Sequence, residues 1–133
     1  KILLDTHMLL WALTENSKLP IKANKIINSS ENVIFYSVVS VWETMIKHMR
    51  RPENLNVSPS ELVHYCEGAK MKCLTLNIAH IFTLETLSRP EDAPPHKDPF
   101  DRILISQAKS EHMTFLTHDD LLPFYNEDCI MYV

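Results

Sequence analysis

Five short apolar segments alternate with segments of helical periodicity along the whole chain. Each apolar segment is rich in β-branched, aromatic or other apolar residues and is bounded by polar ones, as strands are. We predict strands at 1–5, 33–37, 73–76, 114–117 and 129–133. Short strands that are apolar on both faces and alternate with helices are typical of a parallel sheet with helices on both sides. The predicted fold class is therefore α/β, a three-layer α/β/α sandwich with a mostly parallel central sheet, formed by a single domain, 1–133.

The segments between these strands carry the signals of helices. Pro20 and Pro59 suit the starts of helices, Thr6 is a candidate cap, and three prolines between residues 88 and 97 mark a loop. We predict helices at 8–13, 21–30, 38–49, 61–71, 78–87 and 98–112, with a short helix after 117. Trp11 and Trp42 lie in apolar helical stretches, so we interpret both as core or subunit-interface residues rather than platforms for base stacking.

Composition excludes several classes of site. Gly68 is the single glycine, so the glycine-rich loops that cradle phosphates in nucleotide-binding proteins are ruled out. Cys66, Cys73 and Cys129 show no paired short spacing, and no apolar run approaches the length of a secretion signal or a membrane span. We therefore expect free thiols, a cytoplasmic location and no association with a membrane.

Four carboxylates lie where this fold would gather functional groups. Asp5 ends the first strand, and Asp119 follows the apolar run at 114–117. The carboxyl ends of strands border the ligand crevice in open α/β sheets. Asp101 falls in the first turn of its helix, and Glu43 lies within helix 38–49 on the face shared with Val39 and Ile46.

Each acid also has a simpler structural explanation. Asp5 could be a turn residue, Asp119 a helix cap, and Glu43 could pair with Lys47 four residues on. Asp98 could cap the helix that holds Asp101, or it could replace Asp101 as a ligand. Asp120 competes in the same way with Asp119.

Taken together, the acids indicate a metal site. Two unpaired carboxylates about 4 Å apart repel by about 4 kcal/mol at an effective dielectric constant near 20, so a fold that gathers several needs a cation. Oxygen ligands favour Mg²⁺ or Mn²⁺. Such an ion activates water for attack on a phosphodiester, and it also reverses the local charge. The net charge of −4, which argues against simple binding of nucleic acid, is therefore compatible with this chemistry.

With these residues in view, the chain resembles PIN domains, and specifically the VapC-type toxins of bacterial toxin–antitoxin pairs. LLDTHMLLWAL at 3–13 resembles the first family motif, with Asp5 as its acid, and YSVVSVWETMIKH at 36–48 resembles the helix that carries the family glutamate, here Glu43. HKDPFDRILISQA at 96–108 resembles the third motif, with Asp101, and FLTHDD at 115–120 the fourth, with Asp119.

The resemblance covers essentially the whole chain and implies a function. It implies an endoribonuclease that depends on Mg²⁺ or Mn²⁺, acts on RNA, forms a homodimer and is neutralised by a cognate protein antitoxin. Asp5, Glu43, Asp101 and Asp119 would be both its catalytic residues and its metal ligands. The fourth acid is the least strictly required in the family.

Several residues near these acids are candidates for contact with substrate. Arg102 could bind an RNA phosphate or pair with an acid, while the hydroxyls of Thr6 and Thr117 could orient a carboxylate or a water. His96 and His118 precede candidate acids and could act near the site. A last group of basic residues could guide RNA or simply end a helix: Lys47, His48, Arg50 and Arg51.

Two other classes of function compete with this hypothesis. A phosphatase with Asp5 as nucleophile is one, but dehalogenase-like enzymes carry a second aspartate where this chain has His7, and the chain lacks room for a cap domain. A receiver domain would need paired acids at the end of the first strand, which Asp5 and Thr6 do not supply. The other class is an inactive PIN-like module that only binds RNA or protein.

Overall fold

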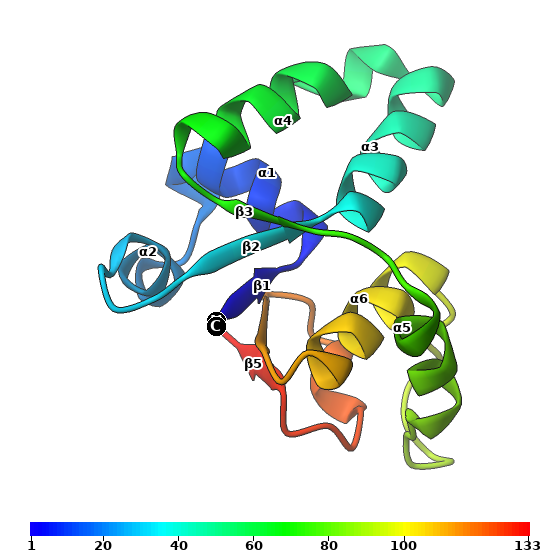
Figure 1. Cartoon of the computed structure of the whole chain (residues 1–133). Helices are drawn as coiled ribbons and strands as arrows, with labels where there is room; N and C mark the ends of the chain where they lie inside the picture. Colours follow the sequence, from blue (N-terminus) through cyan, green and yellow to red (C-terminus); the bar gives the residue numbers. More distant parts are fainter.

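The computed structural model describes residues 1–133 and contains one five-stranded sheet (Figure 1). Its strands are β1 (Ile2–Leu4), β2 (Ile34–Ser37), β3 (Lys72–Leu74), β4 (Thr114–Thr117) and β5 (Ile130–Tyr132). They lie in the order β3-β2-β1-β4-β5, and all four pairings are parallel. The prediction of a parallel central sheet is confirmed.

Six α-helices lie between the first four strands, whereas β4 and β5 are joined through a 3₁₀ turn alone. The helices are α1 (Thr6–Thr14), α2 (Ile21–Asn28), α3 (Val38–Arg50), α4 (Pro59–Gly68), α5 (Ile78–Thr83) and α6 (Pro99–Ser110). Short 3₁₀ turns are η1 (Asn16–Lys18), η2 (Pro52–Asn54), η3 (Leu84–Thr86) and η4 (Leu122–Phe124). The helix expected at 78–87 therefore ends in a 3₁₀ turn, and the short helix expected after 117 is wholly 3₁₀.

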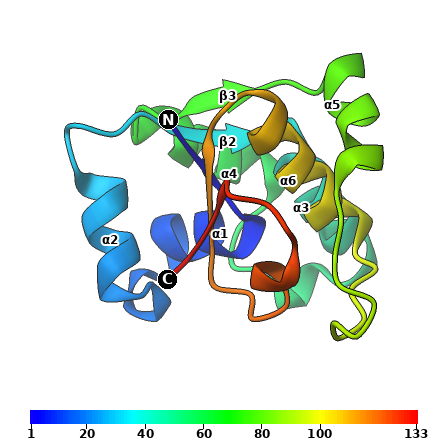
Figure 2. The ribbon, with the colours of Figure 1, turned by 90° about the horizontal axis from the view of Figure 1, so that it is seen from below.

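Two apolar cores lie on opposite faces of the sheet. In β1 the side chains alternate, so Ile2 and Leu4 join one core with α1, α2 and α4, whereas Leu3 joins the other with α6. Helices α5, α6 and α3 lie beside one another on the side away from α2 (Figure 2). The three-layer α/β/α arrangement is thus confirmed. None of the helices combines the length and apolarity that a membrane span requires.

Helix α3 differs from the expectation for an apolar helix. Its buried residues are Val39, Ser40, Glu43 and Thr44, which are mostly small or polar. Trp42 is 55% exposed and touches Phe100 edge-on, with ring centroids 4.9 Å apart. Of the two alternatives for Trp42, the core position is wrong because α3 turns this face outward, and a position at a subunit interface stays a prediction. Trp11 is half-buried and packs against the core of α1, α2 and α4.

The strand order sets the position of the candidate site. The connection after β1 leads to β2 on one side, and the chain later returns to place β4 on the other side of β1. The neighbouring strands β1 and β4 therefore lead into connections that run in opposite directions along the sheet. Their carboxyl ends form a topological switch point, the place where open α/β sheets form their ligand crevices. Asp5 directly follows β1, and Asp119 follows β4 by one residue.

Candidate active site

Asp5 is buried at the junction of β1 and α1, where both of its carboxylate oxygens have partners. Oδ1 accepts a hydrogen bond from the backbone amide of Thr6 at 2.7 Å, so Asp5 is the N-cap of α1. The role of cap expected for Thr6 is therefore wrong, because Thr6 already belongs to the helix. Oδ2 accepts from the Thr117 hydroxyl at 2.6 Å and lies 3.3 Å from Nδ1 of His7.

Asp101 is buried in the first turn of α6, opposite Asp5. The preceding Asp98 is the N-cap, since its Oδ1 accepts hydrogen bonds from the amides of Phe100 and Asp101 at 2.8 and 3.2 Å. The Asp101 carboxylate is thereby free to face the site, where its Oδ2 lies 3.1 Å from Nε2 of His96. The other ring nitrogen of His96 lies 2.8 Å from the Tyr125 hydroxyl, so the imidazole is held from both sides.

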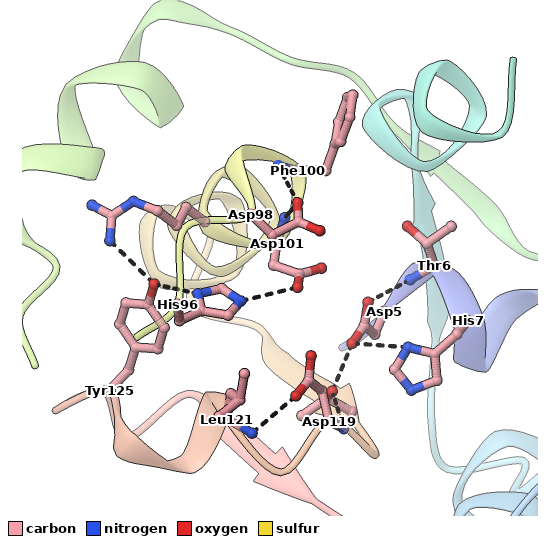
Figure 3. Close-up of polar contacts among 12 residues, drawn as sticks. Asp5, Thr6, His7, His96, Asp98, Phe100, Asp101, Asp119, Leu121 and Tyr125 are labelled. Atoms are coloured by element: carbon pink, nitrogen blue, oxygen red, sulfur yellow. Dashed lines mark hydrogen bonds and ion pairs between the residues drawn. The ribbon is translucent and has the colours of Figure 1, made fainter. Parts of the chain in front are cut away.

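Asp119 completes a group of three converging side chains. Its backbone amide donates to Oγ1 of Thr117 at 3.0 Å, and its Oδ1 accepts from the amide of Leu121 at 2.9 Å. One ligand atom each from His96, Asp101 and Asp119 lies within 4.8 Å of the others. Figure 3 shows Asp5, Asp101 and Asp119 pointing toward a common space from three different segments.

Glu43 reaches the same region from α3 and is engaged at both oxygens. The Thr6 hydroxyl donates to Oε1 at 2.8 Å, and Oγ of Ser40 lies 2.9 Å from that hydroxyl. Lys47 donates to Oε2 at 2.8 Å. The pairing with Lys47 that the sequence allowed is therefore present, and Glu43 is nevertheless buried beside Asp5 and Thr6 rather than turned to solvent.

Burial and neighbouring charge act together on Asp5. The pKa of Asp5 is raised to about 7, chiefly by burial and in addition by the charges of Glu43 and Asp119, against the lowering effect of the hydrogen bond from Thr117. The two neighbouring acids contribute because they lie close to Asp5. Residues from three distant parts of the chain thus interact electrostatically in one place.

The same causes act on Asp101. Burial raises the pKa of Asp101 to about 7, and the charges of Asp5, Asp98 and Glu43 add to the rise, while the hydrogen bond with His96 opposes it. The structure therefore brings together all four acids that the sequence singled out. In the absence of a cation, these carboxylates hold their charge at an electrostatic cost.

This donor set suits a hard divalent cation. Burial is the main cause of the raised pKa of Asp5 and Asp101, and a cation would offset both the loss of solvation and the repulsion that adds to it. Carboxylate oxygens are the ligands that Mg²⁺ and Mn²⁺ prefer. Asp5, Asp101 and Asp119 supply such oxygens at the shared space (Figure 3), and Glu43 lies near Asp5, bound to the Thr6 hydroxyl. A ring nitrogen of His96 also lies at this space, although the sequence led us to expect oxygen ligands alone. Its contacts with Asp101 and Tyr125 are those of a group that orients a carboxylate.

The remaining predicted residues lie around this cluster. Arg102 donates to the Tyr125 hydroxyl at 3.1 Å instead of pairing with an acid, so it shares a partner with His96. His118 is exposed, stacks on Tyr132 and bonds through Nδ1 to the carbonyl of Val133. Asp120 is also exposed, and it accepts a hydrogen bond from Tyr132 rather than facing the acids.

Two residues of the site escaped the sequence analysis. His7 contacts Asp5, and burial lowers the pKa of its imidazole below the ordinary value. The sequence did contain a signal for His7, because it lies two residues after the acid that ends the first strand and in the first turn of a helix. Tyr125 gave no local signal, since it reaches His96 across 29 residues of sequence.

The comparison with protein families identifies the chain. The PIN domain family matches residues 2–125, a range that includes Asp5, Glu43, Asp101 and Asp119. The chain therefore belongs to the PIN domain family, and the resemblance drawn from the four motifs is confirmed at this level. No curated protein sequence gives a significant match.

Solved structures share the fold. A chain of the crystal structure of VapBC2 from Rickettsia felis bound to a DNA fragment from their promoter has a TM-score of 0.65 and 15% identity, with 99% of this chain and 96% of that chain covered. A chain of DNA-bound VapBC from Salmonella typhimurium has a TM-score of 0.68 and 12% identity, with 99% and 97% covered. At these identities the likeness concerns the fold.

Proposed function

We propose that this chain is an endoribonuclease that depends on Mg²⁺ or Mn²⁺ and acts as a single domain. PIN domains are nuclease-type domains, which supports the broad class. The observation that carries the proposal is the meeting of Asp5, Asp101 and Asp119 at the switch point of the sheet, with Glu43 buried beside them. Carboxylates arranged in this way suit hydrolysis of a phosphodiester without a serine, cysteine or histidine nucleophile.

Each part of the site has a role in this proposal. Asp5, Asp101 and Asp119 hold the cation directly, and Glu43 completes the acidic cluster. When bound, the cation supplies a Lewis acid that lowers the pKa of water and stabilises negative charge on the phosphodiester. Three positioning residues fix the direction of the carboxylates: Thr117 acts on Asp5, Thr6 on Glu43 and His96 on Asp101.

The substrate side is formed by residues around the acids. Arg102 is held by Tyr125 beside His96, so its planar guanidinium can contact a phosphate that enters the site. His118 lies on the exposed flank next to Asp119 and is the second candidate for contact with RNA.

We further propose that the protein is the toxin of a toxin–antitoxin pair. The likeness to chains of two VapBC complexes supports a partner protein that acts as its antitoxin. The proposed biological form is a cytoplasmic homodimer that the cognate antitoxin inhibits by covering the acidic site. Co-expression with a candidate antitoxin should restore growth to cells that this chain alone arrests.

The direct test is cleavage of RNA by the purified protein with and without divalent ions. We expect cleavage with Mn²⁺ or Mg²⁺, none with a chelator, and none from Asp5→Asn. The matched control is Asp92→Asn, because Asp92 is an exposed loop acid away from the cluster. Cleavage by Asp5→Asn at the rate of the control would refute the role of Asp5. Stabilisation by Mn²⁺ without any cleavage would instead indicate a binding module.

A further inference from the structure

A line of hydrogen bonds leads from Arg102 to the carboxylate of Asp101. Nη1 of Arg102 donates to the Tyr125 hydroxyl at 3.1 Å, and that hydroxyl lies 2.8 Å from Nδ1 of His96. Nε2 of His96 lies 3.1 Å from Oδ2 of Asp101 (Figure 3). The His96 side chain is 3% exposed and Tyr125 is 4% exposed, so the polar atoms of both depend on their neighbours in the line for partners.

The two ends of this line fix the direction in which its protons point. A guanidinium only donates hydrogen bonds and an ionised carboxylate only accepts them, so Nε2 of His96 carries the proton that it donates to Asp101. A neutral imidazole has a proton on one nitrogen alone, which leaves Nδ1 as the acceptor for the Tyr125 proton. In a charged imidazolium both ring nitrogens would donate, and the buried hydroxyl proton, with Arg102 already donating to its oxygen, would lose its partner.

Packing holds the Tyr125 ring in place beside His96. The guanidinium carbon of Arg89 lies 5.1 Å from the centroid of the Tyr125 ring. The His96 ring meets the same ring edge-on, with centroids 5.5 Å apart. The next residue, Asn126, donates from its backbone amide to the carbonyl of Ser88 at 2.9 Å, which joins this segment to the loop that carries His96. The Tyr125 hydroxyl is therefore fixed relative to Nδ1 of the imidazole.

The direction of the line decides which atoms are left for a cation. A nitrogen that carries a proton has no lone pair for a metal ion, and the lone pair of Nδ1 accepts the Tyr125 proton. One ring nitrogen of His96 lies within 4.8 Å of ligand atoms of Asp101 and Asp119, yet in this tautomer the ring orients a carboxylate instead of binding the ion. Loss of the hydroxyl would let the ring proton move to Nδ1, and Nε2 would then be a nitrogen ligand of the kind that suits Zn²⁺.

We propose that Tyr125 is a positioning residue that holds His96 in the tautomer with its proton on Nε2, and thereby keeps the site for a hard cation bound through oxygen. The inference rests on the cation site of the proposed function and adds the residue that sets the class of its ligands. Tyr125 acts through His96, because its hydroxyl bonds to the imidazole and to Arg102 and to none of the acids.

Nitrogen NMR of the metal-free protein reads the tautomer. The chain has seven histidines, and the signals of His96 are those missing from the spectrum of His96→Gln. At about pH 8, where an ordinary imidazole is neutral, we expect a protonated Nε2 and an unprotonated Nδ1 in the wild-type protein. In Tyr125→Phe, which keeps the ring and removes the hydroxyl, we expect the proton to be shared between both nitrogens. A proton on Nδ1 in wild type, or an unchanged His96 spectrum in Tyr125→Phe, would overturn the proposal.

Binding of Mn²⁺ and of Zn²⁺ in the absence of RNA tests the consequence for the ligands. We expect Tyr125→Phe to weaken Mn²⁺ binding about tenfold, because Asp101 loses its orienting partner, and to raise the ratio of Zn²⁺ to Mn²⁺ affinity. The matched control is Tyr132→Phe, because the Tyr132 hydroxyl also donates to an acid, the exposed Asp120, outside the cluster. Affinities for both ions that are equal in Tyr125→Phe and in the control would refute the role of Tyr125.

A double variant distinguishes action through His96 from a general loss of structure. His96→Gln still offers an N–H to Asp101 but has no tautomer for Tyr125 to select. In that background we expect Tyr125→Phe to change Mn²⁺ affinity by less than about twofold, since the two side chains act as one unit. A full tenfold loss in the double variant, beyond that of His96→Gln alone, would show that Tyr125 acts independently of the imidazole and would contradict the proposal.

Cleavage of RNA keeps this inference separate from the proposed function. Equal rates of cleavage by Tyr125→Phe and wild type at limiting Mn²⁺ would contradict the positioning role and leave the ribonuclease intact. The expected tautomer, together with weaker Mn²⁺ binding by Tyr125→Phe, in a protein that never cleaves RNA would support the positioning role and contradict the ribonuclease.

Discussion

At the level of a single residue, Asp101 combines a fixed position in its helix with a high electrostatic cost. It needs its helix start for position, yet burial and three neighbouring acids make its charge unfavourable. The hydrogen bond with His96 relieves only part of this cost, because the pKa of Asp101 stays raised in spite of it. The charged form of Asp101 is therefore the costly form in the protein without metal.

We predict that Asp101→Asn stabilises the metal-free protein above pH 7. A carboxyl with a raised pKa binds its proton more tightly in the folded state, so stability is highest below the unfolded pKa near 4 and falls as the pH rises to about 7. The variant lacks this loss. Melting temperatures between pH 5 and 8 should fall less steeply for Asp101→Asn than for wild type.

The Asp92→Asn variant is the control for that experiment, since its loop position predicts a wild-type slope. A destabilised Asp101→Asn protein at every pH would mean that the carboxylate contributes more to the start of α6 than its repulsion costs.

We predict that Thr117→Val raises the pKa of Asp5 above its wild-type value. The Thr117 hydroxyl donates to Asp5 at 2.6 Å and lowers the pKa of that carboxyl. Valine has nearly the same shape but no donor, and loss of a buried hydrogen bond also costs about 1 kcal/mol in unfolding free energy. Carboxyl carbon shifts followed by NMR during a pH titration measure the change.

Thr117→Ser restores the hydroxyl and should bring the pKa of Asp5 back toward the wild-type value. An unchanged pKa in the valine variant would show that the hydroxyl acts on the amide of Asp119 alone.

At the level of elements, α6 shows how one helix start positions a functional group. Asp98 accepts hydrogen bonds from two amides and Pro99 occupies the first position, so the helix begins at a fixed residue and Asp101 faces the cluster. The capping role and the possible ligand role of Asp98 can be separated because asparagine caps helices as well as aspartate does.

We predict that Asp98→Ala lowers the free energy of unfolding by about 1 kcal/mol and that Asp98→Asn leaves it nearly unchanged. Urea denaturation measures both effects. If Asp98 acts only as a cap, the asparagine variant should also keep divalent-ion binding. Loss of ion binding in Asp98→Asn with normal stability would make Asp98 a ligand.

The elements themselves were largely predictable, because each depends on local pattern. The predicted strand 33–37 begins one residue before β2. The predicted helix 98–112 begins one residue before α6 and ends two residues after it. The outward face of α3 was not predictable. Its apolar residues indicated burial, yet α3 packs its polar Ser40, Glu43 and Thr44 inward because they border the acidic cluster.

The candidate acids were predictable for a different reason. Asp5 and Asp119 follow strands, and parallel strands end at the same edge of a sheet, so topology alone draws them together. The contacts of Tyr125 with His96 and Arg102 depend on how two distant loops meet. No local periodicity encodes such a meeting, and no sequence signal was available for it.

At the level of the whole molecule, we predict that Mn²⁺ or Mg²⁺ raises the melting temperature of the protein. An ion that binds only the folded state stabilises it by about 2.7 kcal/mol at a concentration a hundred times its Kd. Binding also offsets the cost of the buried charges of Asp5 and Asp101, whose pKa values are raised by burial first and by their acidic neighbours in addition. Calorimetry with and without a chelator gives the shift, and Asp5→Asn should reduce it. Indifference of the wild-type protein to both ions would argue against a metal site.

The insertion of β4 beside β1 has a consequence during synthesis. Asp5 and Glu43 leave the ribosome early, but the hydroxyl that orients Asp5 belongs to Thr117, a separation of 112 residues. A nascent chain that ends before β4 can pair β1 with β2 and β3, yet it lacks Thr117 and Asp119 and cannot assemble the cluster. The acidic site is therefore finished only after β4 has left the ribosome, however early Asp5 and Glu43 emerge.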